Sequence, residues 1–210
     1  MDLSNKHTDY NNEFFGRWAW LYDFEKYIFF PLRKKSVEFA NLQSHKKILD
    51  VATGTGALAV EFAKSGHDVV GIDLSSKMLA QAKKKLDPKL KLIFQEADGT
   101  ALPFKDNSFD ISTISWGIHD MPYEVGVKVL QEMKRVTKKD GSILIVDYVE
   151  PKKHKVARFT HPLISLYETK NYKPFIKRGI ETYLKEVGLK VVREGNFLGV
   201  WQMLMLKNSI

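Results

Sequence analysis

The residues best suited to chemistry lie between positions 48 and 59, where the chain reads ILDVATGTGALA. Ile48 to Val51 predicts a short buried strand, and Gly54 and Gly56 permit a tight turn with backbone conformations closed to other residues. The residues from Ala57 onward predict a helix. A glycine turn that opens a helix exposes backbone N–H groups and lets a ligand approach the main chain closely. The pattern therefore indicates a site for a nucleotide-like cofactor.

Two further candidates follow an apolar strand predicted at 109–115. The ring of Trp116, at the end of this strand, could stabilise a cation, or it could simply be packed in the core. His119 could take a proton near neutral pH, or it could only position a substrate or cap the following helix. Trp116, because it follows a strand end, is expected at the pocket mouth.

The elements that must position these residues alternate between strand and helix. Such alternation predicts a parallel sheet covered on both faces, with ligands outside the carboxyl ends of the strands. Ser75 is a plausible N-cap, and Asp140-Gly141 marks a turn. Strands are expected at 48–51, 67–73, 89–95, 109–115 and 142–149, and helices at 57–66, from 75 onward and at 124–137.

Both ends of the chain depart from this alternation. A helix is predicted at 176–187, followed by strands at 189–194 and 197–207 that are joined by a hairpin at Gly195-Asn196, so the sheet should close with an antiparallel strand. Residues 8–44 predict an aromatic-rich helical segment, which Pro31 should break into two helices. We expect one globular unit: a helical cover, residues 1–45, and a cofactor-binding domain, residues 46–210.

Composition narrows the chemistry and the setting. The 210 residues include no cysteine, which excludes disulfides, thiolate catalysis and cysteine-ligated zinc. No metal-binding constellation is evident in the sequence. The sequence has no stretch of about 18 or more apolar residues, so no transmembrane helix is expected. The polar N-terminus lacks a signal-peptide core. A cytoplasmic protein is the simplest expectation.

The net charge of +8 is concentrated at one end of the chain. Residues 151–210 carry twelve basic and four acidic side chains, a balance of +8, so they account for the whole excess. The density is highest over residues 152–178, where Glu168 is the single acid. This segment is either a solvated lysine-rich face or a surface that meets acidic lipid, an acidic substrate or nucleic acid.

Two cofactors compete for the glycine turn. The run GTGALA, with Asp73 at a suitable distance, also fits the dinucleotide fingerprint G-x-G-x-x-G/A. However, Asp50 just before the loop would repel a pyrophosphate, about 45 residues precede the first strand, and the antiparallel end is unusual for a dinucleotide domain. S-adenosyl-L-methionine (SAM) fits better, because it lacks phosphate and carries a sulfonium, an ammonium and a ribose diol.

The chain resembles the class I SAM-dependent methyltransferases from about Tyr22 to Pro151, and in particular the ubiquinone/menaquinone biosynthesis C-methyltransferase group and generic type 11 methyltransferases. The resemblance implies a Rossmann-like doubly wound α/β fold with seven strands. The matching segments are Tyr22-Asp23, ILDVATGTG, Gly71-Ile72-Asp73, Ala97-Asp98-Gly99 with the ALPF and NSFD runs after it, Ile114 to Asp120, Glu132 to Val136, and Lys139-Asp140-Gly141.

The resemblance also implies roles for single residues. Asp50 would attract the SAM ammonium, Asp73 would accept both ribose hydroxyls, and Asp98 would accept from the adenine amino group. Met78 and Leu102 could sandwich the adenine. The expected cofactor-binding set is Tyr22, Asp50, Ala52, Thr53, Gly54, Thr55, Gly56, Asp73, Leu74, Met78, Asp98, Gly99 and Ser115, and the expected catalytic residues are His119 and Trp116.

The methyl acceptor is left open by the sequence. His119-Asp120 stands where the quinone-pathway relatives usually carry Arg-Asn. The leading expectation is C-, O- or N-methylation of a small, amphipathic or lipid-like molecule, with residues 152–178 touching an anionic membrane. The alternatives are an RNA methyltransferase that uses the same basic surface, an NAD-type oxidoreductase, and a catalytically silent SAM sensor.

Overall fold

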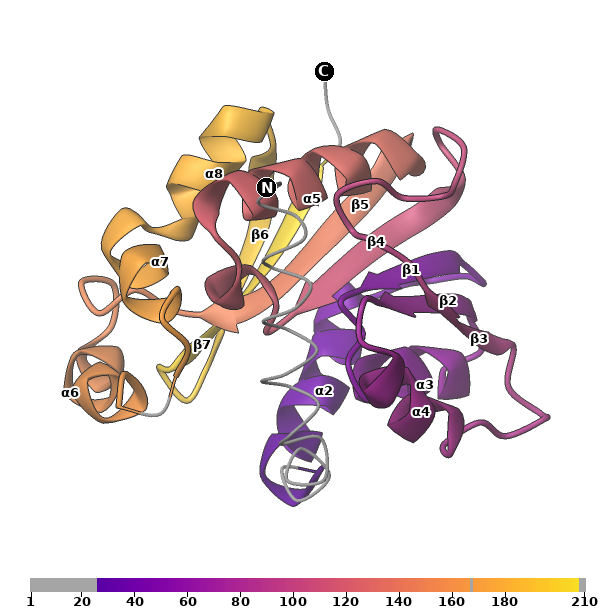
Figure 1. Ribbon diagram of the computed structural model, residues 1–210, viewed down its shortest axis with the longest axis horizontal. Helices are drawn as coiled ribbons and strands as arrows, with labels where there is room; N and C mark the ends of the chain where they lie inside the picture. Colours follow the sequence, from indigo (N-terminus) through magenta and orange to yellow (C-terminus); the bar gives the residue numbers. More distant parts are fainter. Residues whose placement is uncertain (1–25, 167, 208–210) are drawn as a thin grey trace.

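The fold is a single twisted sheet with helices on both faces (Figure 1). The computed structural model describes residues 26–166 and 168–207; Tyr22 and most of the expected helical cover lie outside this range. The seven strands run in the order β3-β2-β1-β4-β5-β7-β6. They are β1 (Lys47–Val51), β2 (Asp68–Asp73), β3 (Leu92–Glu96), β4 (Phe109–Ser115), β5 (Thr137–Tyr148), β6 (Lys190–Phe197) and β7 (Trp201–Lys207).

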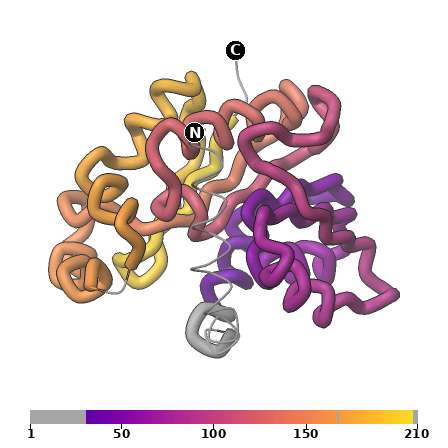
Figure 2. The backbone as a smooth tube through the Cα atoms, in the orientation of Figure 1, coloured from indigo at the N-terminus to yellow at the C-terminus, as the bar shows by residue number. Residues whose placement is uncertain are grey.

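The strand directions confirm the predicted fold class. β1 pairs in parallel with β2 and β4, and β5 extends the parallel set beside β4. Only β7 is inserted in the opposite direction, antiparallel to both β5 and β6. Figure 2 shows the indigo-to-purple chain at one end of the sheet and the orange-to-yellow chain at the other.

Helices cover the sheet on both sides and follow or precede the strands in the expected alternation. The described helices are α2 (Lys26–Ala40), α3 (Ala57–Lys64), α4 (Ser76–Lys83), η1 (Ile118–Asp120), α5 (Tyr123–Val136), α6 (Lys155–Ile164), α7 (Tyr172–Arg178) and α8 (Ile180–Val187). The predicted N-cap is confirmed, since the Ser75 hydroxyl accepts from the backbone N–H of Met78.

Neighbouring residues of β1 define two hydrophobic layers, because side chains alternate across a strand. Ile48 packs with α2, α3 and α4 on one face, whereas Leu49 packs with α5 and α8 on the other. Both side chains are fully buried. This double covering anchors the central strands and aligns their carboxyl ends along one edge.

The hairpin turn was predicted at the wrong glycine. Gly195 and Asn196 lie inside β6, and the chain reverses at Leu198-Gly199, where both residues have positive φ angles, 55° and 70°. Asn196 supports the turn because its Oδ1 accepts from the Gly199 N–H at 2.6 Å. Glycine is needed at position 195 for space, because a Cβ there would lie 2.7 Å from the ring of Phe39.

Two helix predictions were also wrong. The closing helix expected at 176–187 is two helices, α7 and α8, separated by Gly179 with a φ of 78°. Pro31 does not break α2, which continues from Lys26 to Ala40 through the exposed proline. The helix is retained because its face bearing Leu32, Ser36 and Ala40 is buried against the sheet layer, and this packing outweighs the one N–H lost at proline.

Two strand boundaries differ as well. β3 begins at Leu92 rather than Lys89. β5 begins at Thr137, so the expected turn at Asp140-Gly141 is an irregularity within the strand, where the pairing with β4 shifts register. Gly141 is needed there because a Cβ would lie 2.7 Å from the carbonyl oxygen of Asp110.

Candidate functional site

The loop after β1 is held in a left-handed backbone conformation. Ala52, Gly54 and Gly56 have φ angles of 52°, 55° and 74°. The Thr53 N–H donates to the Ile72 carbonyl at 2.8 Å, and the Gly56 N–H donates to the Thr53 carbonyl at 2.9 Å. A Cβ on Gly56 would lie 2.3 Å from the Phe94 ring, so glycine is required both by conformation and by space.

Asp50 supports this loop from beneath. Its carboxylate accepts from the Thr53 hydroxyl and from the Thr113 hydroxyl, each at 2.6 Å. The side chain is fully buried and does not line the cavity described below. Burial raises the pKa of Asp50 to about 6 despite the two hydroxyl donors.

Asp73 ends β2 and joins two parts of the site. Its Oδ2 accepts from the Gly54 N–H and its Oδ1 from the Ser75 N–H, both at 2.8 Å. Each carboxylate oxygen still has acceptor capacity toward the cavity that it lines. Burial raises the pKa of Asp73.

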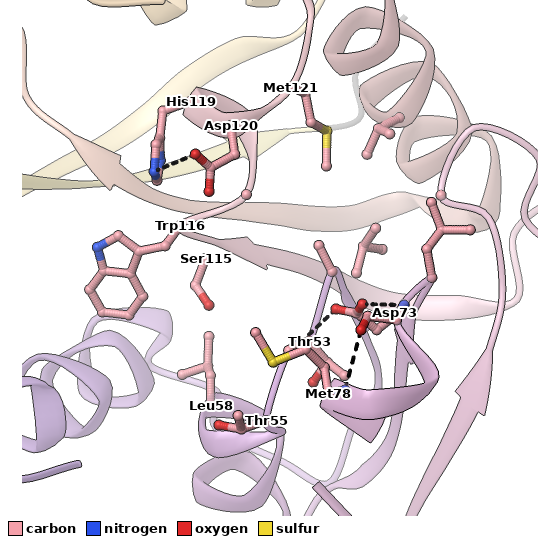
Figure 3. Close-up of a pocket in the computed structure, with 18 of the residues that line it drawn as sticks. Thr53, Thr55, Leu58, Asp73, Met78, Ser115, Trp116, His119, Asp120 and Met121 are labelled. Carbon is pink, nitrogen blue, oxygen red and sulfur yellow. Dashed lines mark hydrogen bonds and ion pairs between the residues drawn. The ribbon is translucent and has the colours of Figure 1, made fainter. Parts of the chain in front are cut away.

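A cavity opens at the carboxyl ends of β1, β2, β4 and β5, as expected for this sheet type. Figure 3 shows Thr53, Asp73 and Met78 on one side, and Trp116, His119 and Asp120 on the other. The predicted residues that line it are Ala52, Thr53, Gly54, Thr55, Asp73, Leu74, Met78, Asp98, Gly99, Ser115, Trp116 and His119.

Some predicted residues lie elsewhere. Gly56, like Asp50, supports the loop without lining the cavity. Leu102, expected beside the adenine, belongs to the buried core. Asp98 lines the cavity, where its Oδ1 accepts from both the N–H and the hydroxyl of Thr100 at 2.8 Å.

The other end of the cavity is built around a buried histidine. His119 lies in η1 with 3% of its surface exposed. Its Nδ1 lies 2.7 Å from Oδ1 of Asp147, and its backbone N–H donates to Oδ2 of the same residue at 3.3 Å. Its Nε2 lies 3.5 Å from both Asp120 Oδ1 and Glu168 Oε2.

Aromatic rings surround this histidine. The rings of Tyr148, Tyr172 and Phe175 meet the imidazole edge-to-face, with centroid distances of 5.0, 6.0 and 6.3 Å. The Tyr148 hydroxyl also donates to Glu168 Oε1 at 2.7 Å. Trp116, at the end of β4, has a φ of 51°, a conformation that costs energy for a large side chain and occurs preferentially at functional sites.

The charges at this end are strongly coupled. Burial alone would lower the pKa of His119, but Asp120 and Asp147 outweigh it and raise that pKa well above the ordinary value. Burial raises the pKa of Asp120 to about 6. Burial would also raise the pKa of Glu168, but His119 and the Tyr148 hydroxyl lower it overall.

Sequence reasoning missed several of these residues. Asp147 ends a buried strand just as Asp50 and Asp73 do, so the same pattern could have identified it. Glu168 stood out as the single acid of a basic segment, but nothing in the sequence placed it beside His119. Arg33 and Tyr148 line the cavity without a local signal.

Residues 48–141 match the family model described as a methyltransferase domain. Over these residues the chain is similar to methyltransferase domains. The match includes the glycine loop, β2 and the segment after β4, so it confirms the resemblance seen in the sequence.

The curated relatives that the chain matches are named as methyltransferases. The ubiquinone/menaquinone biosynthesis C-methyltransferase UbiE of Bdellovibrio bacteriovorus is 40% identical over 119 residues, 55% of this chain and 50% of that protein. The demethylmenaquinone methyltransferase of Thermus thermophilus is 39% identical over 125 residues, 58% of this chain and 56% of that protein. The chain spans about half the length of these relatives.

Solved structures of methyltransferases have the same fold as this chain. Magnesium protoporphyrin IX methyltransferase of Synechocystis with bound SAH matches this chain with a TM-score of 0.73 at 18% identity. The match covers 98% of this chain and 100% of that protein's chain. A SAM-dependent methyltransferase of Aquifex aeolicus has a TM-score of 0.63 at 18% identity, with coverages of 82% and 88%. At this identity the likeness concerns the fold.

Proposed function

We propose that this protein is a SAM-dependent methyltransferase whose acceptor is a small, amphipathic or lipid-like molecule. The observation that carries the proposal is one cavity with two chemically different ends: the glycine loop with Asp73 at one end, and the His119 cluster at the other. A donor site and an acceptor site side by side are what group transfer requires, because alignment of the two reactants lowers the barrier.

The cofactor is SAM, held at the end nearest β1 and β2. Asp73 has acceptor capacity for the ribose hydroxyls, and Asp98 has it for the adenine amino group. Gly54 leaves room for close approach, since nothing lies within 4 Å of where its Cβ would be. Bound there, SAM supplies an electrophilic methyl group.

Charge favours this cofactor over a dinucleotide. Four carboxylates line the cavity, from Asp73, Asp98, Asp120 and Glu168, while Arg33 supplies the guanidinium among the described lining residues. Such a lining suits a sulfonium cation and opposes a pyrophosphate. NAD-type oxidation is accordingly not favoured.

Trp116 and His119 form the acceptor end in this proposal. The indole and the imidazole line the part of the cavity that follows β4, and Asp147 fixes the ring orientation of His119. His119 positions the acceptor beside the methyl group, and Trp116 forms the cavity wall next to the acceptor. The relatives named as menaquinone and ubiquinone methyltransferases support a ring-bearing, lipid-like acceptor.

Helix α6 provides a surface for reaching such an acceptor in an anionic bilayer. Phe159 and Leu163, four positions apart in α6, are 78% and 66% exposed, and Leu166, just after the helix, is 80% exposed. Ala157 and Ile164 are buried. The exposed basic side chains of Lys155 and Arg158 flank these exposed apolar residues. A mixed apolar and basic face suits an acidic lipid surface better than RNA. No helix among the described residues is long and apolar enough to cross a membrane.

Calorimetric titration with SAM, S-adenosylhomocysteine and NAD(H) tests the cofactor. Micromolar binding of the two adenosyl compounds is expected, with at least about tenfold weaker binding in Asp73→Asn because a carboxylate acceptor is lost. Asp68→Asn is the matched control, since Asp68 begins the same strand at its other end and is partly exposed. Binding of NAD(H) without either adenosyl compound would refute the proposal.

Vesicle sedimentation tests the lipid contact. The protein should sediment with phosphatidylglycerol-containing vesicles at low salt, less at high salt, and hardly at all with phosphatidylcholine alone. Phe159→Ser with Leu163→Ser should abolish sedimentation, whereas Leu86→Ser, at another exposed apolar residue, should not. Equal sedimentation of both variants would refute the role of α6.

A further inference from the structure

Three potential ligand atoms converge beside the proposed acceptor end of the cavity. His119 Nε2, one Asp120 oxygen and one Glu168 oxygen lie within 4.8 Å of one another. The imidazole nitrogen is 3.5 Å from each carboxylate. Two ligands on a tetrahedral ion at about 2.1 Å lie about 3.4 Å apart, so the two separations of 3.5 Å from the imidazole suit one shared cation.

In two of the three side chains the other polar atom already has a partner. Asp147 accepts from Nδ1 of His119, which leaves Nε2 to face the carboxylates. Tyr148 donates to Glu168 Oε1, which leaves Oε2 toward the imidazole. Carboxylate support of one histidine nitrogen is the usual arrangement behind a metal-ligating histidine.

The hydrogen bonding of Asp120 gives a further indication of a missing ligand. Its Oδ1 is buried and makes no hydrogen bond to any described residue, and its ion-pair contact with His119 Nε2 is long, at 3.5 Å. A buried carboxylate oxygen without a donor at hydrogen-bond distance is costly. A cation at the shared position would satisfy that oxygen.

The charge balance points the same way. Three carboxylates, from Asp120, Asp147 and Glu168, surround one imidazole in a largely buried cluster. A metal-ligating imidazole is neutral, so any proton on Nε2 would be released when the ion binds. The three ionised acids then carry three negative charges, and a divalent ion would reduce this excess to one.

We propose that His119, Asp120 and Glu168 bind a divalent transition-metal ion, with Asp147 and Tyr148 orienting the ligands. One imidazole and two carboxylates suit Mn²⁺ or Zn²⁺. Because the three ligands also line the cavity, the open coordination positions would face the acceptor. The site goes beyond the proposed function, since it requires neither a methyl donor nor a lipid.

Metal binding can be measured with the metal alone. The full chain, stripped with EDTA and freed of chelator, would be titrated with Mn²⁺ while free Mn²⁺ is followed by electron paramagnetic resonance. About one bound Mn²⁺ per chain is expected, displaceable by Zn²⁺. Asp120→Asn and Glu168→Gln should each weaken binding by at least about tenfold, and Asp147→Asn by about tenfold through loss of orientation.

The control is Asp98→Asn, which removes another cavity carboxylate outside the cluster. It should keep the Mn²⁺ affinity while weakening SAM binding, so the metal proposal and the cofactor proposal can fail separately. Thermal unfolding of each metal-free variant checks that it is folded. Absence of stoichiometric Mn²⁺ or Zn²⁺ binding in the folded chain, or binding that Asp120→Asn and Glu168→Gln leave unchanged, would overturn the proposal.

Discussion

His119 Nδ1 and Asp147 Oδ1 lie 2.7 Å apart, although the residues are separated by 28 positions in the chain. The contact joins η1, which follows β4, to the carboxyl end of β5. Asp147 is fully buried and also accepts from the backbone N–H groups of His119 and Tyr148. One carboxylate therefore sets both the position of the η1 backbone and the orientation of the imidazole.

Asp147→Asn should separate positioning from cofactor binding. The amide lacks the charge that holds the imidazole, so the ring should move from its place in the cavity wall. We expect methyl transfer to fall about 100-fold, as small misplacements of a reacting geometry typically do, while the dissociation constant for SAM stays within about twofold. Asp140→Asn, an exposed acid on the same strand, serves as control in steady-state and calorimetric assays. Parallel loss of SAM binding would contradict this separation.

Gly54 and Gly56 should differ in their tolerance of alanine. Both have positive φ, but a Cβ on Gly54 meets nothing within 4 Å, whereas one on Gly56 would lie 2.3 Å from Phe94. Gly54→Ala should cost about 1 kcal/mol of unfolding free energy through backbone strain alone. Gly56→Ala should cost about 2–5 kcal/mol, because strain and overpacking add.

Urea unfolding of the two glycine variants measures this difference. Phe94→Leu combined with Gly56→Ala should recover part of the loss, which identifies the ring as the obstacle. Equal destabilisation by the two alanine substitutions would show that conformation alone dictates glycine in this loop.

Asp50 should make the stability of the protein depend on pH. Its folded-state pKa is raised to about 6 from 3.8, chiefly by burial, so the folded protein binds this proton more tightly than the unfolded chain. The resulting stabilisation is fully present below pH about 4 and is lost as the pH rises through about 6. The difference corresponds to about 3 kcal/mol.

Unfolding free energies of the native protein and Asp50→Asn, measured from pH 4 to pH 8, test this expectation. The asparagine variant cannot titrate, so the native protein should lose stability relative to it between about pH 4 and pH 6. Curves that stay parallel over this range would show that Asp50 has the same pKa in the folded and unfolded states.

Arg135 should be required for the order of the segment after Asp98. Its guanidinium donates to the carbonyls of Leu102 and Phe104 and to the carboxylates of Glu132 and Asp106. Lysine cannot reproduce this planar set of donors. Arg135→Lys should lower the unfolding free energy by about 1–3 kcal/mol and weaken SAM binding, whereas Lys128→Arg, on the exposed side of α5, should change neither. Unaltered SAM affinity in a destabilised Arg135→Lys variant would show that the segment does not depend on this clamp.

Much of the cofactor end could be predicted from local sequence. The strand, turn and helix from Ile48 onward depend on short-range apolar patterning and on glycine conformation, and the structure reproduces them. Asp73 and the Ser75 cap follow from a residue type at a strand end and a helix start. Such features are set by neighbours in the chain, so the sequence determines them directly.

The errors arose where tertiary packing overrides local preference. Gly195 resembles a turn residue, but the approach of Phe39, more than 150 positions away, explains its presence inside β6. Pro31 resembles a helix break, but burial of the α2 face retains the helix. In each case a contact distant in sequence supplied more stabilisation than the local signal removed.

The sequence by itself determined the class of fold, the position of the glycine loop and the acids at the ends of β1 and β2. Only the tertiary structure decided that Asp147, from β5, and Glu168, from the segment after α6, would face His119. No periodicity connects these residues, because they come from separate elements that meet only when the sheet is assembled and the C-terminal helices fold over its edge. Their carboxylates become chemically important through burial and mutual distance, which are properties of the folded chain.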